Sequence, residues 1–131
     1  MAMDSAPAPV SKIAFWAGVV LTVLPALMLI MSGVMKLTGG TEVEKGFQHL
    51  GWPAHLAVAL AVVEFTCTVL YLIPRTAVLG AVLLTGYLGG AIATHVRLEE
   101  QFVAPVVLGV VLWFALYLRD ARVRALLPFR S

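Results

Sequence analysis

One carboxylate, Glu64, lies near the middle of a mainly apolar run at residues 54–73 (AHLAVALAVVEFTCTVLYLI). A helix of this length, at about 1.5 Å rise per residue, spans roughly 30 Å, which is the thickness of the hydrocarbon core of a bilayer. An acidic side chain at the centre of such a helix costs about 2.5–3.5 kcal/mol on insertion scales. The sequence therefore predicts that other helices cover Glu64 and supply a partner for it.

The composition of the chain is that of an integral membrane protein. Hydrophobic residues make up 61% of its 131 residues and charged residues 12%, whereas a soluble domain carries about 25% charged residues. The net charge of +2 is too small to indicate a nucleic-acid partner. Because Cys67 is the single cysteine, neither an intramolecular disulfide nor a CxxC pair can form. Dithiol–disulfide exchange by this chain alone is therefore excluded.

Four apolar runs separated by short connections predict an all-α fold, an integral membrane four-helix bundle. We expect a disordered tail at residues 1–11 and one domain at residues 12–131, with spans at about 13–36, 54–73, 76–96 and 102–118. The stretch Thr41-Glu42-Val43-Glu44 fits a capping box. It predicts a short interfacial helix between the first two spans, over about residues 42–49.

Polar residues on three of the spans make up a candidate ligand-binding site. Glu64 shares one helix face with Thr68, while Ser32 and Lys36 fall on the polar face of the first span. His95 ends the third span on the same outer side as Lys36, so we expect the polar surroundings of Glu64 to open towards the outer face. The candidate ligand-binding residues are Glu64, Lys36, His95, Ser32, Tyr87 and Thr68.

Two of these residues allow another interpretation. Glu64 could be a neutral structural acid that is hydrogen-bonded to a neighbouring helix, instead of a ligand or proton site. Lys36 fits a snorkelling anchor at the outer end of the first span better than a partner of Glu64, since a direct pair requires its side chain to reach inward. No HxxxH or HxxE pair lies on one helix, so no metal site is predicted.

The third span contains a GxxxG motif at Gly86 and Gly90. Small residues at this spacing allow the backbone of a neighbouring helix to approach closely. We therefore expect both glycines to lie at a helix–helix contact.

Taken in order, five features of the sequence resemble the DoxX-like family of small four-helix bacterial membrane proteins. They are SGVMKL (residues 32–37), EKGFQHLGWP (44–53), the glutamate of the second span, LIPRTAVLGAVLLTGYLGGAIATHVR (72–97) and LWFALYLRDARVRALLP (112–128). The resemblance covers about residues 13–129. It implies a membrane partner in redox or stress chemistry, because the relative DoxD is named as a subunit of a thiosulfate:quinone oxidoreductase. It implies no catalytic role for any residue.

Three classes of function agree with these observations. The first is a subunit or accessory protein of a membrane-associated oxidoreductase or stress-response system, with quinone or lipid as the molecule contacted and no catalysis by the chain alone. The second is a small-molecule or lipid-binding membrane protein or transporter with an outward-opening polar cavity around Glu64. The third is a non-catalytic membrane scaffold. Candidate partners are the lipid bilayer, a soluble or membrane oxidoreductase and a second copy of the chain.

The distribution of basic residues predicts the topology in the inner membrane. Four spans place both termini on one side, which carries six positive residues against three on the other, so the positive-inside rule places both termini in the cytoplasm. A reporter that fluoresces only in the cytoplasm should therefore light up when it is fused after Ser131. Periplasmic activity of an alkaline phosphatase fused at the same position would contradict this topology.

Overall fold

The computed structural model describes residues 8–129, and every regular element within that range is a helix. The four long helices are α1 (Lys12–Thr38), α3 (Ala57–Leu72), α4 (Ala77–Arg97) and α5 (Val103–Arg119), and the shorter elements are α2 (Gly40–Leu50), α6 (Ala121–Leu126), η1 (Ala54–Leu56) and η2 (Pro74–Thr76). The prediction of an all-α membrane helical bundle is confirmed. Most of the expected disordered tail, residues 1–7, lies outside the described residues.

The helices have the lengths that membrane spans require. Three segments are long and apolar enough to cross a membrane, namely Lys12–Thr38, Ala54–Leu72 and Pro74–Arg97. The fourth apolar helix, α5, has 17 residues, which corresponds to roughly 25 Å and to the lower limit for a span. The outward faces of these helices expose large aliphatic side chains such as Val20, Leu24 and Val62.

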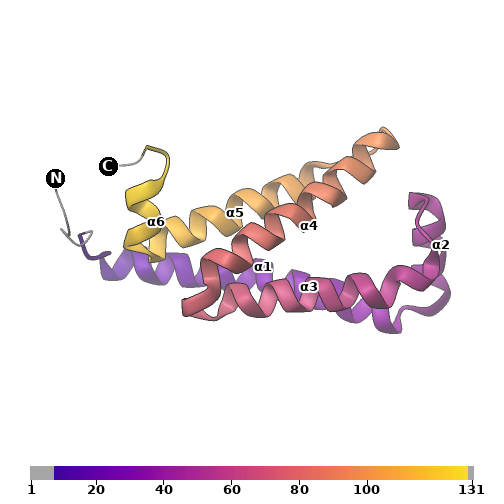
Figure 1. The fold of residues 1–131 in the computed structure, drawn as a ribbon, viewed down its shortest axis with the longest axis horizontal. Coiled ribbons are helices and arrows are strands. Elements are labelled where there is room, and N and C mark those ends of the chain that lie inside the picture. Colours follow the sequence, from indigo (N-terminus) through magenta and orange to yellow (C-terminus); the bar gives the residue numbers. More distant parts are fainter. Residues whose placement is uncertain (1–7, 130–131) are drawn as a thin grey trace.

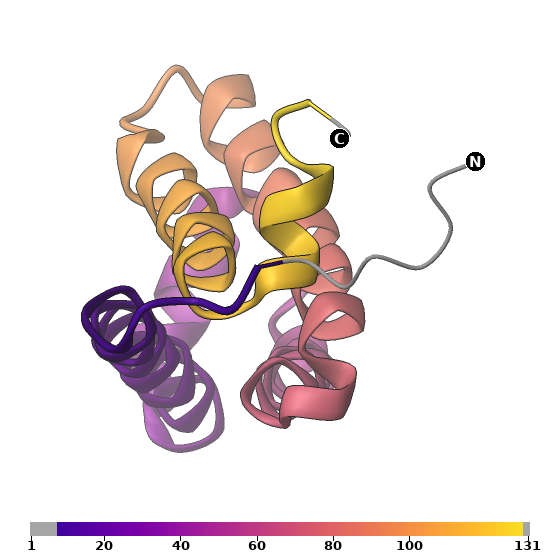
Figure 2. The same cartoon turned by 90° about the vertical axis from the view of Figure 1, so that its left-hand side faces the viewer.

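The long helices form a closed ring in which each packs against two others. Helix α1 contacts α3 and α5, and α4 contacts the same two helices from the opposite side. Seen along the bundle in Figure 2, the four helices surround a common axis, and α6 crosses the end near the start of α1. In Figure 1, α4 and α5 diverge from α1 and α3 towards the other end, where α2 lies. The bundle is therefore narrow at the α6 end and wide at the α2 end.

Most of the hydrophobic core lies in the narrow half of the bundle. Tyr71, Leu84, Leu112 and Leu116 are fully buried there, from the second half of α3, the first half of α4 and the second half of α5. The hydroxyl group of Tyr71 donates a hydrogen bond of 2.7 Å to the backbone oxygen of Leu112. This bond joins α3 to α5 across the bundle and satisfies the one polar atom of a buried tyrosine side chain.

The closest backbone approaches occur at glycines other than the GxxxG pair. A Cβ atom added at Gly80 would overlap the backbone of Tyr71, and one added at Gly18 would lie 2.8 Å from the oxygen of Ala115. At Gly86 and Gly90, an added Cβ would meet no neighbouring element of the described chain within 4 Å. The predicted close contact at Gly86 and Gly90 therefore does not form within the described chain, because both glycines lie where α4 has diverged from its neighbours.

The predicted helix between the first two spans is present as α2. It begins at Gly40, with Gly39 as a cap that makes no side-chain hydrogen bond. Thr41 therefore lies inside the first turn, and the expected capping box does not form. Phe47 is the buried residue of α2, and Gly51 ends the helix with φ 81°, the left-handed conformation that glycine adopts without strain.

Gly80→Ala should lower the melting temperature of the purified protein in detergent, because overpacking at a backbone contact costs about 1–3 kcal/mol. Gly86→Ala is the matched control, since it introduces the same side chain into open space on the same helix. It should leave the melting temperature unchanged or raise it, because alanine favours a helix over glycine by about 1 kcal/mol. Equal effects of the two variants would contradict the close packing of α3 and α4 at Gly80.

Candidate functional site

A cavity of about 550 Å³ lies in the wide half of the bundle, where α1 and α3 face α4 beneath α2. Its volume lies within the range of about 300–1,000 Å³ that is typical of small-molecule sites. The walls are mainly aliphatic and aromatic, and the polar groups gather on α1, α3 and α4. The lining residues are Met28, Leu29, Ser32, Lys36, Phe47, Leu50, Trp52, Leu60, Glu64, Gly86, Tyr87, Leu88, Gly90, Ala91, Thr94, His95 and Leu108.

Three side chains converge on one oxygen atom of Glu64 in this cavity. Glu64 Oε2 accepts hydrogen bonds from Lys36 Nζ at 2.8 Å and from the hydroxyl group of Tyr87 at 2.6 Å. A longer bond of 3.4 Å comes from Ser32 Oγ. Lys36 also donates to Ser32 Oγ at 2.7 Å. We call these four residues the Glu64 cluster; it connects α1, α3 and α4.

The two partners of the ion pair in the Glu64 cluster differ in their burial. The side chain of Glu64 is 1% exposed, while that of Lys36 is 17% exposed. The expectation that neighbouring helices cover Glu64 and supply a partner is confirmed. The interpretation of Lys36 as an outer anchor is wrong, because its four-carbon side chain extends along α1 and reaches the carboxylate directly. A buried carboxylate without that cation would carry a large desolvation cost.

Two buried polar atoms of the cavity-lining residues have no hydrogen-bond partner among residues 8–129. They are Glu64 Oε1 and His95 Nδ1. Buried polar groups are nearly always hydrogen-bonded, so each such atom in a folded protein requires an explanation. Both residues border the same cavity. The residues that line the cavity therefore include two buried polar atoms that the described chain leaves unpaired.

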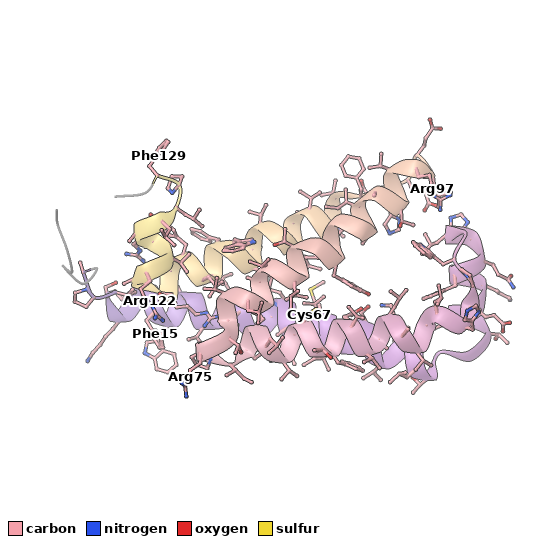
Figure 3. All side chains as sticks on the ribbon, viewed as in Figure 1. Phe15, Cys67, Arg75, Arg97, Arg122 and Phe129 are labelled. Atoms are coloured by element: carbon pink, nitrogen blue, oxygen red, sulfur yellow. The ribbon has the colours of Figure 1, made fainter. Side chains whose placement is uncertain are left out.

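Polar contacts hold α2 against the end of α4 and against the α4–α5 connection at the wide end of the bundle. Arg97 donates a hydrogen bond to the backbone oxygen of Leu50, and His49 Nε2 contacts the carboxylate of Glu100. Figure 3 shows Arg97 at the end of the bundle near α2. Because Leu50 is itself a lining residue, this contact fixes one wall of the cavity.

The structure brings together five of the six candidate residues named from the sequence. Thr68 is the exception, since its hydroxyl group donates to the backbone oxygen of Glu64 at 2.7 Å and does not line the cavity. Gly86 and Gly90, expected at a helix contact, border the cavity instead.

Trp52 and Thr94 also line the cavity, although the sequence did not single them out for this site. Trp52 Nε1 donates to Thr94 Oγ1 at 3.4 Å. The sequence contained evidence for Thr94, because it lies seven residues after the candidate residue Tyr87 and therefore on the same face of the helix. No comparable signal existed for Trp52, which precedes its helix and reaches the cavity through the fold of the α2–α3 connection.

Lys36→Met should lower the free energy of unfolding by about 3–5 kcal/mol, because it leaves a buried carboxylate without its cation. Glu64→Gln should cost less, since Lys36 is partly exposed and can turn towards water. The double variant should recover most of the stability lost by Lys36→Met. Equilibrium unfolding in mixed detergent micelles measures the four values.

Lys45→Met provides the control for this cycle, because it removes the same charge from an exposed position on α2 and should leave stability unchanged. Strict additivity of the Lys36 and Glu64 substitutions would contradict direct coupling between the two side chains.

Comparison with known proteins supports one family for the chain. A family model described as the DoxX-like family matches residues 20–115. Searches of curated proteins and of solved structures find no match. The matched segment contains the whole of the Glu64 cluster. The chain therefore belongs to the DoxX-like family.

Proposed function

We propose that the chain binds a small lipid-soluble molecule with an uncharged polar head group in the cavity beside Glu64. The observation that carries this proposal is the position of the Glu64 cluster, which gathers four polar side chains at one place in a mainly apolar cavity. Ligand sites typically combine apolar walls with a few convergent polar groups that fix the orientation of the ligand. The apolar walls would hold the hydrocarbon part of the molecule.

The charges in the cavity favour an uncharged head group. Lys36 and Glu64 already neutralise each other at 2.8 Å, so a charged ligand would introduce a charge without a partner into a desolvated place. Glu64 Oε1 has no donor among the residues that the structure describes, and as a carboxylate oxygen it can accept a hydrogen bond from a ligand hydroxyl group. His95 Nδ1 can accept or donate, depending on the tautomer of the ring.

A quinone or its hydroquinone fits these requirements. A hydroquinone hydroxyl group can donate to Glu64 Oε1, and a quinone carbonyl oxygen can accept from a cavity donor such as Lys36. The same geometry would allow a proton to pass between Glu64 and the ligand. Binding of this class of molecule supports a role as an accessory protein of an inner-membrane oxidoreductase. In this role the partner would carry out the electron transfer, while this chain would hold the quinone.

The binding can be tested with ubiquinone-1 as the probe and Trp52 as the reporter. In the Trp16→Phe/Trp113→Phe background, Trp52 is the sole tryptophan of the chain, and it borders the cavity. Ubiquinone-1 should quench its fluorescence in a saturable manner. Ubiquinol-1, which carries the hydroxyl group that would donate to Glu64 Oε1, should displace the probe. Glu64→Gln should weaken the binding of ubiquinol-1 by about tenfold, the typical effect of losing a charged hydrogen-bond partner.

Gly90→Leu should strongly weaken the saturable quenching, because a leucine side chain narrows the cavity, while its Cβ atom meets no neighbouring element of the described chain within 4 Å. Gly89→Leu is the matched control: it too has open space around it but does not line the cavity. Quenching that is linear in ubiquinone-1, or that is equal in both leucine variants, would show that the probe only partitions into the micelle.

A further inference from the structure

A second hollow lies at the narrow end of the bundle, far from the Glu64 cluster. It has a volume of about 670 Å³ and is bordered by the start of α1, the end of α3 and the junction of α5 with α6. Figure 3 shows Phe15 and Arg122, two of its lining residues, at this end of the molecule, opposite Arg97. The hollow lies where the apolar helices end, which is the boundary between bilayer and water.

Arg119 borders this hollow, and two nitrogen atoms of its guanidinium group lack hydrogen-bond partners in the part of the chain that the structure describes. Its Nε and Nη2 atoms are buried and have no partner among residues 8–129. The guanidinium carbon lies 5.3 Å from the ring centroid of Tyr71, a cation–π contact that satisfies no N–H group. A half-buried arginine with unpaired N–H groups is well suited to bind an acceptor that takes two hydrogen bonds, such as a phosphate or a carboxylate.

The nearest acid does not serve Arg119. Asp120 caps α6 by accepting a hydrogen bond of 2.8 Å from the backbone nitrogen of Arg122, and it also lies 3.5 Å from Arg122 Nε. Arg122 is otherwise extended into solvent, with its side chain 80% exposed. Two arginines therefore border the hollow beside a single carboxylate that is already engaged.

The opposite side of the hollow is apolar and continues down the helices. Phe15 and Val23 of α1 and Leu72 of α3 border it and are about half exposed. Side chains of this kind suit hydrocarbon. The hollow thus combines an arginine-rich edge at the membrane boundary with an apolar groove that runs into the span.

We propose that this hollow binds one anionic phospholipid. The phosphate would meet Arg119 and Arg122, and an acyl chain would lie along Phe15 and Val23. Anionic headgroups are attracted to basic residues at the ends of spans, and basic pockets between membrane helices bind them specifically. A zwitterionic lipid is disfavoured, because its ammonium group would lie beside the two arginines that border the hollow. The proposal does not depend on the ligand of the Glu64 cavity.

Native mass spectrometry tests this with the intact chain released from micelles that contain equal amounts of phosphatidylglycerol and phosphatidylcholine with the same acyl chains. The wild type should retain phosphatidylglycerol in preference. Arg119→Gln should lower that preference by about tenfold, the effect of losing one charge-assisted interaction. Arg75→Gln is the matched control, because it removes the same charge from an exposed residue of the same end that does not border the hollow.

Arg122→Gln covers the case in which Arg119→Gln fails to fold, since the side chain of Arg122 is mostly exposed and its loss leaves the packing intact. It too should reduce the preference relative to Arg75→Gln. Equal retention of the two lipids by the wild type, or equal losses in the Arg75 and Arg122 variants, would overturn the proposal in favour of general surface attraction. Displacement of the lipid by millimolar glycerol 3-phosphate would also overturn it, because the apolar groove would then contribute nothing.

Discussion

The ion pair between Lys36 and Glu64 is the interaction on which the wide half of the bundle depends. A side-chain hydrogen bond between membrane helices contributes on average only about 0.6 kcal/mol, whereas a carboxylate at the centre of a span costs about 2.5–3.5 kcal/mol. One ordinary hydrogen bond cannot offset that cost. A cation and two hydroxyl groups on the same oxygen atom can, and they come from two different helices. The placement of α1 and α4 against α3 is therefore tied to the chemistry of a single residue.

The sequence was sufficient to predict the helices and the need of Glu64 for a partner, because both follow from hydropathy and desolvation. It was not sufficient to identify Lys36 as that partner. The position along the helix gives the depth of the backbone in the membrane, but a flexible four-carbon side chain can place its ammonium group several ångströms away from that depth. The error at Gly86 and Gly90 has a different origin. Small residues permit a close approach, but the angle between two helices decides whether the neighbouring helix lies close enough to make a contact. That angle is set by packing elsewhere, at Gly80 and Gly18.

Tyr71 connects the features of the narrow half. Its hydroxyl group joins α3 to Leu112 of α5, its backbone is the surface on which Gly80 packs, and its ring lies beneath the guanidinium of Arg119. The packed core and the arginine-rich hollow thus share one side chain. A lipid held at Arg119 would act directly on the best-packed part of the bundle, so the surrounding membrane would contribute to the stability of the fold as well as to its solvation.

The divergence of α4 and α5 from α1 and α3 has a consequence for how such a chain can evolve. The closest approaches between helix backbones, at Gly18 and Gly80, lie at one end, while the other end presents two glycines, Gly86 and Gly90, to an open space. Larger side chains at these two positions would reshape the chamber without disturbing the junctions that maintain the architecture. One scaffold could in this way acquire new specificities through very few substitutions, each nearly neutral for folding.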